Sequence, residues 1–313
     1  MRKMLVKAPV RSVLAGKTII KAGAKEIYCS VSAPELQYLP LAARAKFSKY
    51  DQRATELRNY DELKEIVKIA HDNGAKVDFA ANKPNITNEK FESILIKNIE
   101  SAVAAGVDSV IIADPALLKK VKSFHWDVSL LTSTFMDITN SGYVQLLKEL
   151  GAARIIFPHH LTMEEIKRLT VDQDLQYEVF GHFGCAHYNG VCNLCLSNDV
   201  EWPCRYQYTV RGKGVNLSEC SFMDAVEDCT ICYLPELAGA NIDSLKIIGR
   251  DINYNYIAAL TRVYSNALAA YQEGASVKEV REKVGKTLGW DFIYCRQQRC
   301  KYSSASKAVN YYT

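Results

Sequence analysis

One unit recurs along this chain and constrains its fold: a helix-like stretch, then a glycine, then a short apolar run. A helix often ends on a glycine in the left-handed conformation, and a buried parallel strand reads as an apolar run rich in β-branched residues. Each unit therefore predicts a junction between a helix and a parallel strand. The five junctions are Gly23–Tyr28, Gly74–Phe79, Gly106–Ile112, Gly151–Phe157 and Gly239–Ile248.

Three further apolar runs complete a set of eight strands. Amphipathic helices are expected between them, each after an Asn or Asp at the capping position. Eight strands alternating with helices over about 250 residues predict a (β/α)8 TIM-barrel-like fold of the α/β class, with a doubly wound open sheet as the alternative. The further strands are Met4–Ala8, Val128–Leu131 and Tyr177–Phe180, and the expected helices are 60–73 after Asn59, 89–105 after Asn88 and 138–150 after Asp137.

The composition is that of a globular protein. The 313 residues are 48% hydrophobic and 24% charged, which excludes disorder as the main state. Apolar runs fall short of the roughly 20 residues that a membrane span needs, and Lys7, Arg11 and Lys17 interrupt the N-terminal one. We expect a cytoplasmic protein with no membrane span. The formal net charge of +4 is spread over interspersed charges, so nucleic acid is not an expected partner.

Cysteines gather in one region of the chain. The interval between the last two junction glycines is about twice the others, which places a cysteine-rich module, residues 178–237, after the seventh strand. The loops after barrel strands form the catalytic face, and clustered thiols in a large chain favour a metal over disulfides. From residue 276 the barrel pattern stops, giving a domain of residues 1–275 and a C-terminal extension of residues 276–313. The clustered cysteines are Cys185, Cys192, Cys195, Cys204, Cys220, Cys229 and Cys232.

The spacing of the cysteines does not decide which metal they would bind. Two CxxC pairs, Cys192 with Cys195 and Cys229 with Cys232, have the ligand pattern of a structural zinc site. Four thiolates from the same region would equally hold an iron–sulfur cluster.

The segment EVFGHFGCAHYNGVC at residues 178–192 resembles the signature of the collagenase-like U32 peptidase family. Three other segments are similar to that family's motifs, and the resemblance extends over roughly residues 20 to 270. They are Cys204–Tyr206, Asp228–Leu237 and Lys246–Arg250.

This resemblance implies a barrel that holds a [4Fe–4S] cluster, with ligands at Cys185, Cys192, Cys204 and Cys229. It leaves out Cys232, and it makes Cys195 the alternative to Cys204. The better-understood members are oxygen-independent hydroxylases, with prephenate as the implied oxygen donor. The members closest to this chain in length work as pairs of related subunits, so a heterodimer with a related subunit is an expected assembly.

We therefore expect oxygen-independent hydroxylation, or related redox or group-transfer chemistry, on a small aromatic or anionic substrate. Arg53 and Arg250 match family positions and would orient the substrate, and His159 follows a strand on the catalytic face, where it would transfer protons. A peptidase is the alternative, although the chain has neither a nucleophile-elbow nor an HExxH pattern. A non-catalytic cluster-bearing partner subunit is the third hypothesis.

The chain departs from the family pattern at positions that would line or support the pocket. Ile248 stands where relatives carry Glu, Phe135 and Asp137 stand where they carry Gln and Asn, and His159-His160 stands where an Arg is common. The substrate of the known hydroxylases is therefore not carried over to this chain.

Overall fold

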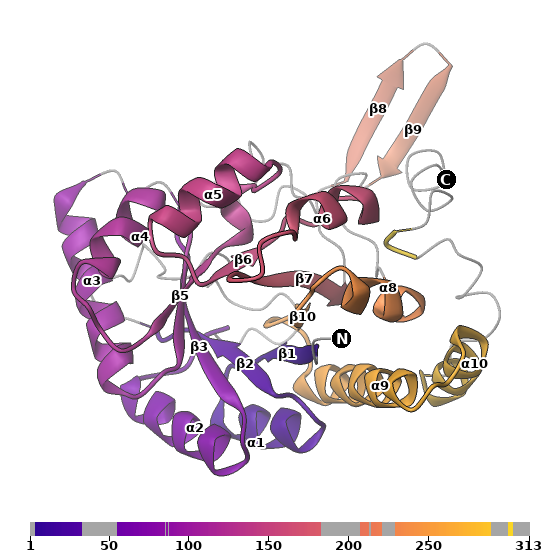
Figure 1. Ribbon diagram of the computed structural model, residues 1–313, viewed down its shortest axis with the longest axis horizontal. Coiled ribbons are helices and arrows are strands. Elements are labelled where there is room, and N and C mark those ends of the chain that lie inside the picture. Colours follow the sequence, from indigo (N-terminus) through magenta and orange to yellow (C-terminus); the bar gives the residue numbers. More distant parts are fainter. Residues whose placement is uncertain are drawn as a thin grey trace.

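The computed structural model describes residues 4–32, 55–84, 86, 88–182, 207–212, 214–220, 229–288 and 300–302. Eight parallel strands close into a barrel in the order β1-β10-β7-β6-β5-β4-β3-β2 (Figure 1). The predicted (β/α)8 fold is confirmed, and the open-sheet alternative is wrong. The barrel strands are β1 (Leu5–Pro9), β2 (Glu26–Cys29), β3 (Lys76–Ala81), β4 (Ser109–Ile112), β5 (Ser129–Thr132), β6 (Arg154–Ile156), β7 (Gln176–His182) and β10 (Ser244–Ile247).

Helices surround this barrel (Figure 1), and α9 packs against both α1 and β1. Asn59 and Asn88 cap α2 and α3 as predicted, each accepting a hydrogen bond from a backbone amide three residues on. The helices are α1 (Val13–Lys21), α2 (Tyr60–Asp72), α3 (Glu89–Ala104), α4 (Pro115–Lys122), α5 (Ser141–Glu149), α6 (Met163–Leu169), α8 (Leu234–Gly239), α9 (Tyr254–Gln272) and α10 (Val277–Leu288), with 3₁₀ turns η2 (Thr134–Met136) and η4 (Ile231–Tyr233).

Two local predictions are corrected. Helix α5 begins at Ser141 and is capped by Asn140, because Asp137 adopts a φ of 50° and ends the 3₁₀ turn η2 instead of starting a helix. The first four junction glycines have positive φ, as expected. At the fifth junction Gly239 is the last residue of α8, and Asn241 takes the left-handed conformation with a φ of 58°. Asn tolerates that conformation better than most residues.

The chain between β7 and α8 adds a feature that the sequence did not predict. An antiparallel hairpin of β8 (Tyr208–Gly212) and β9 (Val215–Cys220) extends away from the barrel (Figure 1). It lies within the predicted module of residues 178–237. In the part of the chain that the structure describes, no helix is long and apolar enough to cross a membrane.

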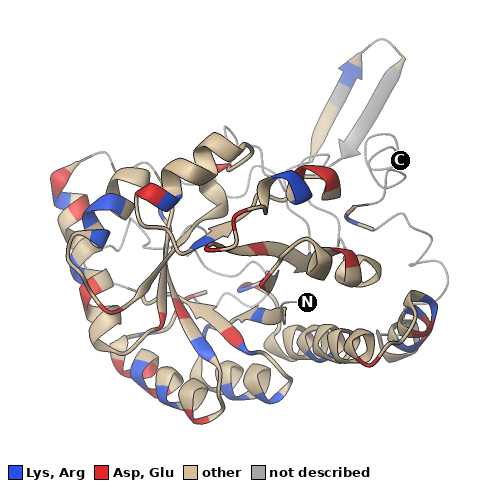
Figure 2. Ribbon diagram, in the orientation of Figure 1, with Lys and Arg blue, Asp and Glu red and all other residues tan. Residues whose placement is uncertain are grey.

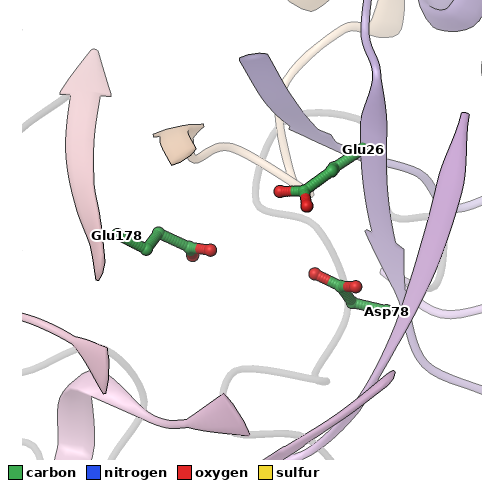
Figure 3. A group of neighbouring side chains, drawn as sticks. All are labelled: Glu26, Asp78 and Glu178. Carbon is green, nitrogen blue, oxygen red and sulfur yellow. The ribbon is translucent and has the colours of Figure 1, made fainter. Parts of the chain in front are cut away.

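The barrel interior has a charged layer nearer the N-terminal ends of the strands and an apolar layer nearer their C-terminal ends. Three carboxylates, Glu26, Asp78 and Glu178, point toward one another from β2, β3 and β7 (Figure 3), with ligand oxygens all within 4.8 Å of one another. The ammonium of Lys7 forms ion pairs with Asp78 and Glu178 and lies 3.8 Å from Glu26 Oε2. Arg154 donates from two nitrogens to Glu26, each at 2.7 Å. We call these five residues the barrel ion network.

The barrel ion network supplies its own cations, so the three carboxylates need no metal ion to balance their charge. Lys246 adds a third cation, with Nζ 3.5 Å from Glu178 Oε1. Figure 2 shows acidic and basic residues on the barrel strands as well as on the outer helices. Above the network an apolar layer closes the interior, formed by Tyr28, Ile111, Leu131, Ile156 and Phe180.

Glu178 is the residue of this network whose loss we expect to cost most. Burial by itself raises the pKa of the Glu178 carboxyl, but Lys7, Lys246 and Arg154 outweigh burial and lower it from 4.5 to about 2. Glu178→Gln leaves those cations under-compensated, so it is expected to lower the free energy of unfolding by about 3–5 kcal/mol in urea titrations at pH 7.

The pH dependence provides a second readout of the same variant. A lowered carboxyl pKa contributes stability above pH 4.5, and that contribution is lost as the pH falls toward 2. Glu178→Gln should lack this part of the acid transition. Glu164→Gln, which removes an exposed pair with Arg168, should cost under about 1 kcal/mol. Equal effects of the two variants would contradict a central role for the network.

Candidate functional site

A pocket opens at the C-terminal ends of the barrel strands. It encloses about 710 Å³ of space not filled by atoms, part of it open to solvent. Its wall combines cationic and aromatic side chains at the strand ends, the face where barrels of this class place their ligands. The residues used below are Tyr28, Phe135, His159, Phe180, Lys246 and Arg250.

Two of the three predicted catalytic residues meet in this pocket. His159 follows β6, is buried, and stacks on Phe180 with ring centroids 3.6 Å apart and planes inclined by 16°. Arg250 follows β10 and is half-buried in the pocket wall. The two residues therefore line one pocket, and their contact with substrate stays a prediction. Arg53 lies outside the described residues.

Several departures from the family pattern fall in the same place. Phe135, His159 and Ile248 all line the pocket. His160 points elsewhere: half of its side chain is exposed, and its Nδ1 lies 4.0 Å from Asp137 Oδ1. The pocket of this chain therefore has apolar surface at two positions where the family pattern carries polar side chains.

Lys246 is a pocket residue that the sequence analysis missed. Its Nζ lies 4.2 Å from the centroid of the Tyr28 ring and 6.0 Å from that of Phe180. The lysine reaches from the charged interior through the apolar layer, and only 7% of its surface is exposed. Burial lowers the pKa of its ammonium to about 8, against the opposing effect of Glu178. The sequence could have revealed this residue, because Lys246 stands at an inward-facing position of β10 and its side chain must therefore point into the barrel.

The predicted metal ligands are only partly described. Cys185, Cys192, Cys204 and the alternative Cys195 lie outside the described residues. Cys229 is described and partly buried, and its backbone pairs with that of His182 at the end of β7. Its Sγ lies 3.8 Å from the phenol oxygen of Tyr264, and burial raises the pKa of its thiol to about 12.

The end of β7 therefore lies next to both the pocket and Cys229. Phe180 lines the pocket, and two residues later His182 pairs with the thiol-bearing Cys229. His182 itself is fully buried, with Nδ1 3.1 Å from the Tyr264 oxygen. Tyr264 therefore lies between the imidazole of His182 and the thiol of Cys229, and His182 does not line the pocket.

This chain is similar to known proteins in both sequence and fold. A relative from Methanocaldococcus jannaschii, an uncharacterized protease, is 28% identical over 86% of this chain and 66% of its own length. The tRNA hydroxylation protein P1 of Bacillus subtilis is 27% identical over 67% of this chain and 54% of its own length. The chain thus spans less than two thirds of these relatives. The solved structure of a U32 peptidase matches 80% of this chain and 94% of its own, with 11% identity and a TM-score of 0.50, and shares the fold. The model of Peptidase family U32 matches residues 11–292, and the chain belongs to that family.

Proposed function

We propose that this chain is an enzyme that uses a [4Fe–4S] cluster for oxygen-independent hydroxylation, or for related redox or group-transfer chemistry, on a small aromatic or anionic substrate. The observation that carries the proposal is the cationic and aromatic pocket that shares β7 with a thiol centre. The relatives named tRNA hydroxylation proteins support the type of reaction.

The thiol at the end of β7 fits a cluster in its chemistry. Among the residues that the structure describes, Cys229 is the one that the family pattern makes a ligand, and iron–sulfur clusters are held by cysteine thiolates. Following the family pattern, we propose Cys185, Cys192, Cys204 and Cys229 as the ligands, with zinc as the alternative occupant. Such a cluster would supply an electron relay or a Lewis acid.

The chain's own residues would bind and orient the substrate. Arg250 and Lys246 place two cations on the pocket wall, suited to a carboxylate, and Tyr28, Phe135 and Phe180 offer aromatic surface. His159 would hold or accept a proton at the pocket wall, and Arg53 would assist Arg250. Prephenate is the oxygen donor we propose to test first, and a related subunit is the partner we propose to seek.

A peptidase is the second candidate, because the relative from Methanocaldococcus jannaschii carries the name of a protease. Peptide cleavage that survives iron chelation and is abolished by thiol alkylation would favour it. A non-catalytic cluster-bearing subunit would instead co-purify with a related chain and bind no small substrate.

The first test is metal content. After anaerobic purification, we expect about four irons and matching sulfide per chain, with the visible absorbance of a cluster. Cys185→Ala should lose this iron because it removes a proposed ligand, whereas Cys195→Ala should keep it. Iron, sulfide and zinc analysis with an absorbance spectrum measures all three proteins.

Two results would contradict this proposal. Zinc without iron in the wild-type chain would contradict the hydroxylase proposal and would indicate that the two CxxC pairs form a structural zinc site. Equal iron in Cys185→Ala and the wild type would overturn the proposed ligand set.

The second test concerns the pocket cations. Lys246→Met and Arg250→Met should each weaken prephenate binding about 10–100-fold at pH 7, because each removes a charge-assisted contact. Since the pKa of Lys246 is about 8, its ammonium is lost as the pH rises, and wild-type affinity should fall through that range. Isothermal titration calorimetry at several pH values measures both effects.

Lys167→Met provides the matched control, because Lys167 is an exposed cation paired with Glu236 outside the pocket. Its affinity and pH profile should equal those of the wild type. If Lys246→Met keeps the wild-type affinity and its alkaline fall, Lys246 does not contact the anion.

A further inference from the structure

Two lysines of the barrel strands point into the interior, and their ammonium groups are paired to different degrees. Lys7 forms close ion pairs with Asp78 and Glu178. Burial lowers the pKa of the Lys7 ammonium, but these carboxylates outweigh burial and raise it. Lys246 has one longer ion pair, 3.5 Å from Glu178 Oε1, and its ammonium makes no hydrogen bond to any residue that the structure describes. Lys246 also lines the pocket, so its ammonium keeps room for a partner bound there.

The nitrogen of Lys246 lies among aromatic rings at the pocket wall. It is 4.2 Å from the centroid of the Tyr28 ring and 6.0 Å from that of Phe180. The Tyr28 hydroxyl donates to the Ile247 carbonyl at 3.3 Å, which holds the ring beside the lysine. His159 stacks on Phe180, so its imidazole lies in the same part of the pocket. A lysine against apolar surface, with a proton-transferring group nearby, is suited to attack on a carbonyl.

The charges around Lys246 make its neutral amine accessible. Burial lowers the pKa of the Lys246 ammonium to about 8. Lys7 and Arg250 lower this pKa further, while Glu178 and Asp78 oppose them. At pH 7 about a tenth of Lys246 is then neutral, whereas an unperturbed lysine is neutral in under about a thousandth of molecules. A nucleophilic lysine is activated in this way, by loss of solvent and by a neighbouring cation.

We propose that Lys246 forms a covalent imine with the carbonyl carbon of an α-keto acid bound in this pocket. Arg250 lines the same wall and pairs with the carboxylate, which in an α-keto acid stands on the carbon next to the carbonyl. The inference rests on the proposed function for the binding of a small anionic substrate here, and it deepens that function by naming the substrate class. Prephenate, the oxygen donor proposed above, carries an α-keto acid group.

The reaction balances without an oxidant or a reductant. The Lys246 ammonium releases one proton to solvent, and the nitrogen lone pair forms a bond to the carbonyl carbon as the carbon–oxygen double bond opens. The His159 imidazole moves a second proton from the nitrogen to this oxygen, and a proton from solvent completes the water that leaves. An ammonium and a ketone thus become a protonated imine and water. Because Lys246 is a cation before and after the reaction, its ion pair with Glu178 is kept.

The test traps the imine by reduction. The full chain is incubated without oxygen at pH 7 with pyruvate and sodium cyanoborohydride, and its digest is mapped by mass spectrometry. Reduction gives a stable secondary amine, so the peptide that contains Lys246 should gain the mass of one pyruvic acid and two hydrogens less one water. We expect at least about tenfold more of this adduct on Lys246 than on the exposed Lys167, because Lys246 has the larger neutral fraction.

Matched controls separate imine formation from general lysine reactivity. Lys301 is a second buried lysine and lies outside the pocket, so it should stay unmodified. Lys246→Arg keeps a cation beside Glu178 but forms no imine, so it should lose the adduct while its circular dichroism equals that of the wild type. Arg250→Met keeps the amine and loses the carboxylate contact, so it should need about tenfold more pyruvate for equal labelling. Acetone, which has no carboxylate, should label Arg250→Met and the wild type equally.

The outcomes distinguish this inference from the proposed function, because trapping requires no metal and iron is measured in the same preparation. A chain that binds iron but carries no more adduct on Lys246 than on Lys167 overturns the inference and leaves the function standing. Selective labelling of Lys246 in a chain that binds no iron upholds the imine and overturns the cluster-dependent function. Equal labelling of Arg250→Met and the wild type by pyruvate overturns the α-keto acid as the substrate class.

Discussion

The ion pairs of Lys7 with Glu178 and Asp78 are the interaction on which the barrel depends. Barrel interiors of this class are usually filled by branched apolar side chains. Here the lower interior is filled by charges, which are stable only when each is compensated, because an unpaired buried charge costs several kcal/mol. Lys7 enters from β1, Glu178 from β7 and Arg154 from β6, so the network closes only when the barrel closes. It therefore selects this closed arrangement over an open sheet.

The same network shapes the pocket above it. Glu178 shares its carboxylate between Lys7 and Lys246, and so holds Lys246 against the face of Tyr28 at the pocket wall. Tyr28 and Phe180 of the apolar layer lie against this cation, while its ammonium stays 3.5 Å from Glu178 Oε1. Glu178 thus offsets the cost of burying the Lys246 ammonium at the pocket wall.

The sequence predicted what local chemistry determines. Junction glycines, Asn caps and apolar runs are short-range signals, and they located all eight barrel strands and the starts of α2 and α3. His159 was found because residues that follow barrel strands lie on one face, and Arg250 because it matches a family position. Pairings between distant residues were not predictable: 171 positions separate Lys7 from Glu178, and nothing local links Cys300 to Cys229. Lys246 lay within reach of prediction, since strand alternation turns it inward, but a motif match alone does not give the direction of a side chain.

Strand β7 ties these parts into one site. Glu178 anchors the ion network, Phe180 supports the pocket wall and His182 meets Cys229, each two residues further along the strand. Alternate residues of a strand share a face, so Glu178 and Phe180 both point into the barrel. The register between β7 and β10 shifts before His182, whose side chain contacts Tyr264 of α9 instead. The ammonium of Lys301 donates to the carbonyl of Phe180, between these two parts of the strand. Lys301 thus ties β7 to Cys229, because its ammonium donates to the Phe180 carbonyl and its backbone amide donates to the Cys229 carbonyl.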